Sequence, residues 1–123
     1  MATVTYSVLA IGGGDDMLAG VTWGNLQNGD LGSPLSRAQW ADRSIQVEGT
    51  FGSGGSLALE GSNDGTNYRV LNDPGLNKLN ITAAGITQIN EITAFVRPHV
   101  TAGDGSTALT VTIVARRNTP NIH

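Results

Sequence analysis

The turn Asn63-Asp64-Gly65 is the first place where the sequence could bind a ligand, because a carboxylate stands there between residues that favour tight turns. Calcium-binding loops need several oxygen ligands at alternating positions and an acidic residue that closes the loop. Asp64 has neutral neighbours, and the nearest acids are Glu60 and Asp73. Asn-Gly and Asp-Gly pairs also supply the positive φ that hairpin turns require. We therefore predict a turn between two strands here rather than a metal site.

The other ionisable residues give little support for catalysis or for a metal centre. Asp15 and Asp16 could share a cation, but an acidic pair after three glycines is more typical of an exposed loop. The two histidines are His99 and the last residue, His123, so imidazoles alone cannot form a metal-ligand cluster. The chain has no Gly-x-Ser-x-Gly elbow, no phosphate-binding loop and no dinucleotide fingerprint. We predict no enzymatic activity, no metal and no cofactor, and we expect His99 to be a strand or interface residue.

Four aromatic side chains could in principle display a sugar-binding platform. Tyr6 and Tyr68 fall in strand-like segments and more simply belong to the core. Trp23 and Trp40 fall in a less regular segment, where aromatic anchors of a protein interface are expected. We predict interface or core packing for these aromatics, with a glycan platform as the alternative. The predicted interface residues are Trp23, Asn28, Asp30, Leu31, Pro34 and Trp40.

Composition and charge exclude several classes of protein. The 123 residues fit one domain, and a chain of this length can bury a core without disulfides or metals. Cysteine is absent, which rules out disulfides and thiolate metal sites. A formal charge of −3 and seven scattered Lys and Arg residues argue against nucleic-acid binding. The apolar runs are also shorter than the roughly 18 residues of a membrane span. We therefore predict neither nucleic acid nor membrane as a partner.

Alternation of apolar and polar residues predicts a series of strands. Thr3–Ile11 has the pattern of a first strand, and from Ser44 onward the two-residue period is strong. The apolar positions that carry this period are Ile45, Val47, Phe51, Leu57, Leu59, Tyr68, Val70, Leu79, Ile81, Ala83, Leu109, Val111, Ile113 and Ala115. The sequence therefore predicts a chain of short strands that each bury one face.

Three segments depart from this pattern. Residues 17–43 are irregular, with Val21-Thr22-Trp23 as their only strand-like piece. Ile86–Ile92 fits either a bulged strand or one helical turn, because its isoleucines recur at three-residue spacing. Phe95–Thr101 is a strand that contains Pro98, which predicts a sheet edge or a bulge, since proline cannot donate to a ladder.

Turn signals recur about every 8 to 12 residues, a spacing typical of an antiparallel sandwich or barrel. They are GSGG at Gly52, SNDG at Ser62, NDPG at Asn72, AAG at Ala83 and GDG at Gly103. We predict an all-β fold, a single antiparallel β-sandwich or jelly-roll-like domain with an irregular N-terminal arm. Its expected parts are an N-terminal strand and arm at 1–43, a sandwich core at 44–117 and a tail at 118–123.

The order of motifs along the chain also carries information. SIQVEGTFGSGG, LALEGSNDGTNYRVLNDPG, ITAAGITQI and VRPHVTAGDGSTALTVTI follow one another between Ser44 and Val114, and TWGNLQNGD precedes them. This order resembles that of small virion proteins of tailed bacteriophages. The turn GSNDG before an aromatic residue is also similar to discoidin-like sugar-binding sandwiches.

The resemblance implies a virion structural protein, a capsid decoration (cement) protein that binds the outer surface of the phage head and stabilises contacts between capsomers. It would be made in the cytoplasm of the host bacterium, and its partners would be the major capsid protein and further copies of itself, as a homotrimer. Two alternatives stay open: a ring-forming neck or tail adaptor, and a carbohydrate-binding module that aids adsorption to the host. The resemblance supplies no functional residues, because the shared motifs are turns and strand cores.

Overall fold

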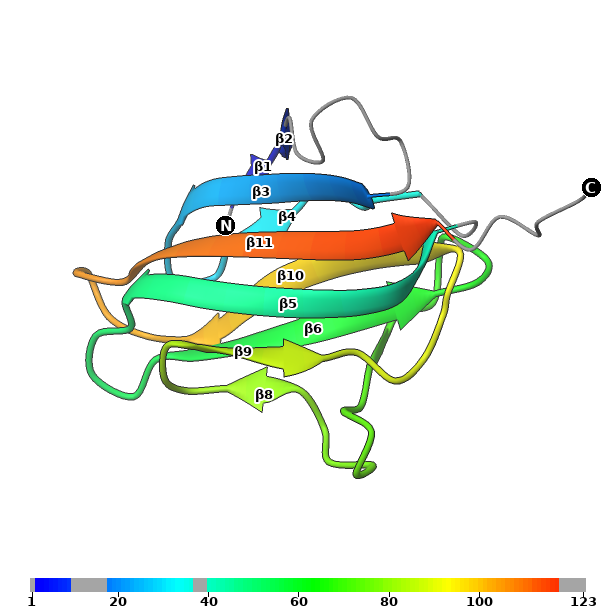
Figure 1. Ribbon diagram of the computed structural model, residues 1–123. Helices are drawn as coiled ribbons and strands as arrows, with labels where there is room; N and C mark the ends of the chain where they lie inside the picture. Colours follow the sequence, from blue (N-terminus) through cyan, green and yellow to red (C-terminus); the bar gives the residue numbers. More distant parts are fainter. Residues whose placement is uncertain (1, 10–17, 37–39, 118–123) are drawn as a thin grey trace, which may run out of the picture.

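The computed structural model describes residues 2–9, 18–36 and 40–117, and all regular structure in these residues is β-strand. The strands form two sheets packed face to face, with sheet B in front and sheet A behind it in Figure 1. The predicted all-β sandwich is therefore confirmed. The predicted exposed loop at Asp15-Asp16 and the C-terminal His123 lie outside the described residues.

Sheet A has six strands in the order β1-β4-β10-β6-β7, with β8 also paired to β6. They are β1 (Thr3–Val4), β4 (Leu31–Gly32), β6 (Ser56–Ser62), β7 (Arg69–Val70), β8 (Asn80–Ile81) and β10 (Phe95–Ala102). Sheet B has five strands in the order β2-β3-β11-β5-β9. They are β2 (Ser7–Leu9), β3 (Leu18–Leu26), β5 (Trp40–Thr50), β9 (Gly85–Gln88) and β11 (Ala108–Arg117). The paired strands run antiparallel except for the parallel pair β1–β4.

At both ends of the strand order the chain passes directly from one sheet to the other. The N-terminal segment pairs with sheet A as β1 and, three residues later, with sheet B as β2. On the opposite side β8 pairs with sheet A and the following strand β9 pairs with sheet B. These crossings tie the two sheets together along both of their edges.

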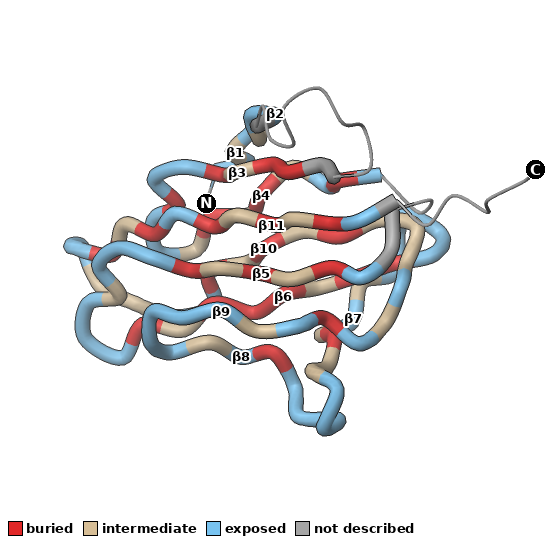
Figure 2. Tube along the Cα trace, in the orientation of Figure 1, coloured by how far each residue is buried: buried red, intermediate tan, exposed pale blue. Residues whose placement is uncertain are grey.

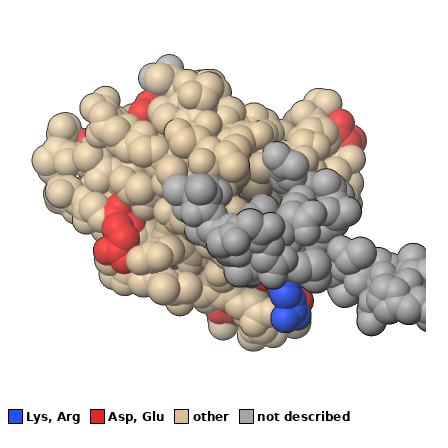
Figure 3. Space-filling view, turned by 45° about the horizontal axis from the view of Figure 1, so that its top comes forward, with Lys and Arg blue, Asp and Glu red and all other residues tan. Residues whose placement is uncertain are grey.

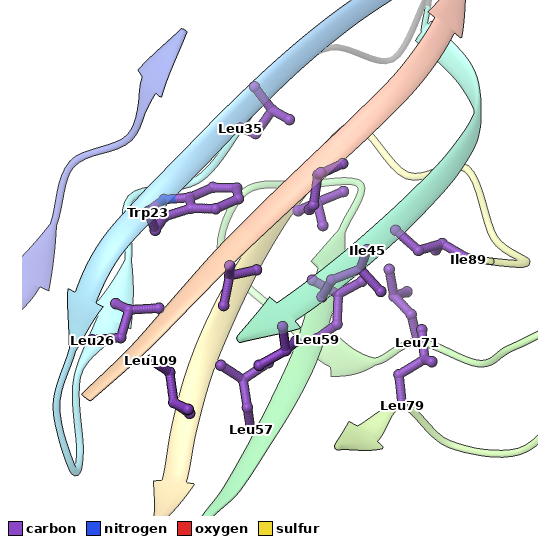
Figure 4. Close-up of a cluster of buried hydrophobic side chains, with 14 of the residues drawn as sticks. Trp23, Leu26, Leu35, Ile45, Leu57, Leu59, Leu71, Leu79, Ile89 and Leu109 are labelled. Atoms are coloured by element: carbon purple, nitrogen blue, oxygen red, sulfur yellow. The ribbon is translucent and has the colours of Figure 1, made fainter. Parts of the chain in front are cut away.

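The core lies between the sheets and follows from strand alternation, since every second residue of a strand points to the same face. Buried and less buried residues accordingly alternate along the central strands in Figure 2. The labelled side chains of Figure 4, including Leu57, Leu59 and Leu109, meet between the sheets with no exposed surface at these three positions. Burying one such side chain stabilises the fold by about 1.5–3 kcal/mol.

The N-terminal third is more regular than its sequence suggests. Strand β3 lies inside sheet B, between β2 and β11, and contributes Val21, Trp23 and Leu26 to the core. A bulge explains why the alternation was hard to see: the pairing with β11 shifts register next to Asn25, whose φ is 56°. Because of this extra residue, Trp23 and Leu26 face the same side although they are three positions apart.

Pro98 lies in neither of the predicted places, because β10 is an interior strand between β4 and β6. The flanking residues Val96 and Val100 donate their N–H groups to the carbonyls of Leu35 and Asp30, at 3.0 and 2.9 Å. Pro98 falls between these two bonds, on the side of β10 that faces β4. The strand thus keeps a backbone hydrogen bond on each side of the proline.

Gly32 in β4 lies close to both Pro98 and Trp23. A Cβ at position 32 would lie 2.5 Å from Cδ of Pro98 and 2.7 Å from Nε1 of Trp23. Only a glycine leaves room for the proline ring and the indole to approach from both sides.

Of the two alternatives for Ile86–Ile92, the strand is confirmed for the first half. Strand β9 covers Gly85–Gln88 and pairs with β5, and Ile89 follows it as a buried core residue. Ile86 points outward and is 69% exposed, which breaks the simple alternation. The three-residue spacing therefore reflects the end of a strand and not a helical turn.

Candidate functional site

The loop at Asn63-Asp64-Gly65 is a turn stabilised by its own carboxylate. Asp64 accepts hydrogen bonds from the Ser62 hydroxyl, the backbone N–H groups of Thr66 and Asn67, and the Asn67 side-chain amide, at 2.8–2.9 Å. The two groups of Asn67, followed by Thr66 and Ser62, hold the pKa of Asp64 well below its ordinary value. Gly65 has a φ of 77°. The predicted turn is confirmed, and the Asp64 carboxylate accepts its hydrogen bonds from groups of the turn itself.

A second carboxylate connects two loops that each cross from one sheet to the other. Asp104, between β10 and β11, accepts the backbone N–H of Ser53 from the loop between β5 and β6, at 2.8 Å. The Ser106 hydroxyl and the backbone N–H groups of Ser53 and Ser106 lower the pKa of Asp104 to about 2. The buried Thr107 donates its hydroxyl to the Phe51 carbonyl at 2.8 Å. These bonds fix the loops at the left of Figure 1 to each other.

The loops at the opposite end are held in the same way. Asp73 accepts the backbone N–H groups of Gly75 and Asn77, both at 2.9 Å. Glu91 accepts the backbone N–H and the side-chain amide of Asn72, at 2.7 and 2.6 Å. Burial alone would raise the pKa of Glu91, but the two donors of Asn72 lower it below its ordinary value. These acids shape the loop around Leu76, which has a φ of 64° and is 71% exposed.

Two of the predicted interface residues are buried and offer no surface contact in the described chain. Of the two roles predicted for Trp23, interface or core packing, the structure shows core packing. Trp23 has no exposed surface. Its ring packs edge-on against the Tyr6 ring, with the ring centres 5.7 Å apart, and its indole N–H donates to the Ser33 carbonyl at 3.0 Å. The carboxylate of Asp30 is turned inward and accepts the backbone N–H groups of Ala2 and Gln27, at 3.0 and 2.9 Å. Trp23 is a core residue, and Asp30 fastens the N-terminal segment to the β3–β4 loop.

For the other four residues, an interface role stays a prediction. Asn28 and Pro34 are exposed, and Leu31 is half-buried on β4. The backbone of Trp40 begins β5, while its side chain lies outside the described residues. Because its side chain is buried, Trp23 cannot contribute to the alternative glycan platform.

The clearest cluster of ionisable side chains lies on the outer face of sheet A. We call Glu60, Tyr68, Arg97 and His99 the Glu60 cluster. Arg97 donates its Nε–H to Oε1 of Glu60 at 2.9 Å, and Nδ1 of His99 lies 2.9 Å from Oε2 of the same carboxylate. The guanidinium carbon of Arg97 stands 3.7 Å from the centre of the Tyr68 ring, a cation–π contact.

Strand register explains why these residues meet. Arg97 lies directly opposite Glu60 in the β10–β6 pair, so both point to the same face. His99 lies two residues further along β10 and therefore also faces outward. The side chains of Glu60, Arg97 and His99 are 14%, 24% and 29% exposed. Sequence analysis placed His99 correctly on a strand but missed its partners, because the β6–β10 pairing joins positions 37 and 39 residues apart.

The outer face of sheet B carries a different set of groups. Thr22 and Thr112 lie opposite each other with their hydroxyl oxygens 3.2 Å apart, and Gln46 donates its side-chain amide to Glu48. Arg116 pairs with Asp42 near one end of this sheet. The described part of the surface in Figure 3 carries few charged side chains. This face offers hydroxyl and amide groups in place of an ionic cluster.

No group of three or more His, Cys, Asp or Glu side chains among the described residues is placed to hold a metal ion. The part of the chain that the structure describes also has no helix long and apolar enough to cross a membrane.

Comparison with solved structures gives a likeness over most of the chain to the SPBc2 prophage-derived protein YomS. The TM-score is 0.61 at 7% sequence identity, over 82% of this chain and 96% of YomS. BH2720 from Bacillus halodurans gives 0.44 at 13% identity, over 85% of this chain and 67% of that one. KdgF from Halomonas sp. gives 0.41 at 11% identity, over 95% and 82%. The chain therefore shares its fold with YomS.

Neither a protein-family model nor a curated protein matches the chain.

Proposed function

We propose that this protein is a virion structural protein of a tailed bacteriophage, and specifically a capsid decoration protein. The observation that carries this proposal is the likeness to YomS, a prophage-derived protein, over 96% of the YomS chain. The likeness covers nearly all of the YomS chain, so the shared part is one whole sandwich. The order of sequence motifs, which resembles that of small virion proteins, supports the same conclusion independently.

The construction of the loops suits a scaffold that must bear load. Asp64, Asp73 and Asp104 each accept several hydrogen bonds from their own or an adjacent loop. Such bonds restrict the loop conformations that the free protein can adopt. A partner that binds these ends therefore meets surfaces that are already ordered, which reduces the entropy lost on association.

In the proposed arrangement the protein is a homotrimer on the outer surface of the head, where it contacts the major capsid protein. Asn28, Leu31 and Pro34 supply the surface contacts of the N-terminal third, together with the side chain of Trp40. A single contact with a millimolar dissociation constant is worth about −4 kcal/mol. Linking three such contacts raises the overall avidity by orders of magnitude without any new chemistry. The trimer would thereby clamp adjoining capsomers, and its role needs no catalysis and no cofactor.

The copy number of the chain in purified virions tests this proposal. Quantitative mass spectrometry against the major capsid protein should give hundreds of copies per particle, and a density map should place them on the head lattice. Six or twelve copies would instead assign the protein to a neck or tail ring. Absence from the particle would refute a virion role altogether.

Oligomeric state gives a simpler second test. Size-exclusion chromatography with light scattering should give three times the 12.7 kDa mass of the chain. A monomer at micromolar concentration would contradict the trimer, while the virion location would be decided by the copy number alone.

A further inference from the structure

The Glu60 cluster is built as a set of oriented donors and acceptors. Arg97 uses its Nε–H for Glu60 and lays its guanidinium on the Tyr68 ring. None of the described residues accepts a hydrogen bond from its two terminal nitrogens. Arg97 is therefore held in position by two neighbours while its terminal N–H donors stay available at the surface.

His99 offers a further group on the same face. Its Nδ1 faces Glu60, which leaves Nε2 on the opposite side of the ring. Residues two apart on a strand are about 7 Å apart, so Arg97 and His99 span the width of a small ligand. Glu60 lies between them, and each of its oxygens has a lone pair beyond the one already used.

This combination of groups selects the chemistry of the ligand. A bare carboxylate would suit Arg97, but it would stand next to the carboxylate of Glu60 and be repelled by it. A hydroxyl group both donates and accepts, so adjacent hydroxyls can take N–H bonds from Arg97 and donate to Glu60 and His99. Half-buried apolar side chains flank the cluster, with Leu31 opposite His99 and Val70 opposite Glu60. They match the C–H surfaces that a sugar ring presents between its hydroxyls.

We propose that the Glu60 cluster on the outer face of sheet A is a saccharide-binding site that recognises adjacent hydroxyl groups. Arg97 is the principal donor, and Glu60 and His99 are the acceptors. Tyr68 is a positioning residue that holds the guanidinium. The site is independent of the assembly role: it stands whether the chain is found on the head, in a ring or outside the virion.

Heteronuclear NMR on the full chain tests the site directly. Neutral hexoses, hexuronates, sodium acetate and a tetraglutamate peptide are each titrated to about 50 mM, which detects a millimolar dissociation constant. At least one sugar should shift the Nε–Hε signal of Arg97 and the ring signals of His99, with amide shifts confined to β4, β6, β7 and β10. Acetate and the peptide should leave these signals in place.

Arg97→Lys keeps the charge but removes the fork of donors, and it should abolish the response to the sugar. Arg116→Lys is the matched control, because it makes the same change at the Arg–carboxylate pair of sheet B and should leave the response intact. His99→Gln provides a second variant in case Arg97→Lys disturbs the fold, and it should weaken binding at least several-fold.

Three results would overturn the inference. They are silence toward every sugar, a sugar response that survives in folded Arg97→Lys, and an equal response to acetate or the glutamate peptide. The last would assign the cluster to an acidic polypeptide partner.

Discussion

The two outer faces of the sandwich rest on the same core but are built from different chemistry. On sheet A one carboxylate, Glu60, gathers an arginine and a histidine, and the arginine lies on an aromatic ring. On sheet B the central contact is a pair of threonine hydroxyls, Thr22 and Thr112. On both faces, strand alternation decides which residues point outward, but it does not decide what those residues do there.

The two faces differ in how well the positions of their polar groups are defined. An ionic network held partly out of water is costly unless its members are paired, so its geometry is well defined. Threonine hydroxyls can exchange a protein partner for water at little cost. Sheet A therefore presents an oriented group of donors, whereas sheet B presents a uniform surface that many neighbours can cover.

The largest loss of stability is expected from a substitution beneath the Glu60 cluster, on the core side of sheet A. Gly32→Ala would place a Cβ 2.5 Å from the Pro98 ring, and Pro98 stands between Arg97 and His99 on β10. Overpacking of this kind lowers the free energy of unfolding by about 1–3 kcal/mol. Gly24→Ala on β3 is the control, because nothing lies within 4 Å of its added Cβ. Urea denaturation of both variants measures the difference, and equal stabilities would show that β4 can move away from β10.

A smaller effect is expected from neutralising the carboxylate of sheet A. Glu60→Gln leaves Arg97 and His99 without their shared charge, which should lower the free energy of unfolding by about 1–2 kcal/mol. Asp42→Asn removes the partner of Arg116 on sheet B, where the side chains are 63% and 51% exposed. An exposed pair of this kind contributes at most about 1 kcal/mol. If Asp42→Asn costs as much as Glu60→Gln, the two faces do not differ in the way described.

Much of the fold could be predicted from the sequence, because local rules govern most of its elements. The alternation of Leu109–Ala115 predicts β11, and Asp64-Gly65 predicts its turn. The register of β3 could not be predicted, since the bulge at Asn25 follows from its pairing with β11. The burial of Trp23 likewise depends on Gly32 and Ser33, which approach it only in the folded chain.

The Glu60 cluster was beyond sequence analysis for the same reason. Its members are brought together by the pairing of β6 with β10, whose first pair, Ser62 and Phe95, lies 33 positions apart in the sequence. Pro98 predicted a sheet edge or a bulge, and so it did not indicate that β10 lies between β4 and β6. Long-range pairing, and not the local pattern, assembles the site.

The loops that join the two sheets should be the acid-sensitive part of the molecule. The folded pKa of Asp104 is about 2, below the value of about 3.9 in an unfolded chain. A carboxyl with a depressed pKa stabilises the fold above its unfolded pKa, and this contribution is lost as the pH falls from about 4 toward 2. Thermal melts of the parent and Asp104→Asn should therefore differ at neutral pH and converge on acidification. A constant difference across this range would contradict the role of the charged form.

The smallest change in stability is expected from removing the threonine hydroxyls at the centre of sheet B. Thr22→Val and Thr112→Val keep the β-branched shape and remove one hydroxyl each, so either change alone should alter the free energy of unfolding only slightly. A double-mutant cycle should give a coupling energy of about 0.2–1 kcal/mol for the cross-strand hydroxyl pair. The sugar response of sheet A should be the same in all three variants, because these residues lie on the opposite face. A coupling energy near zero would show that both hydroxyls bond to water, and the uniform face of sheet B would then owe its order to the backbone ladder alone.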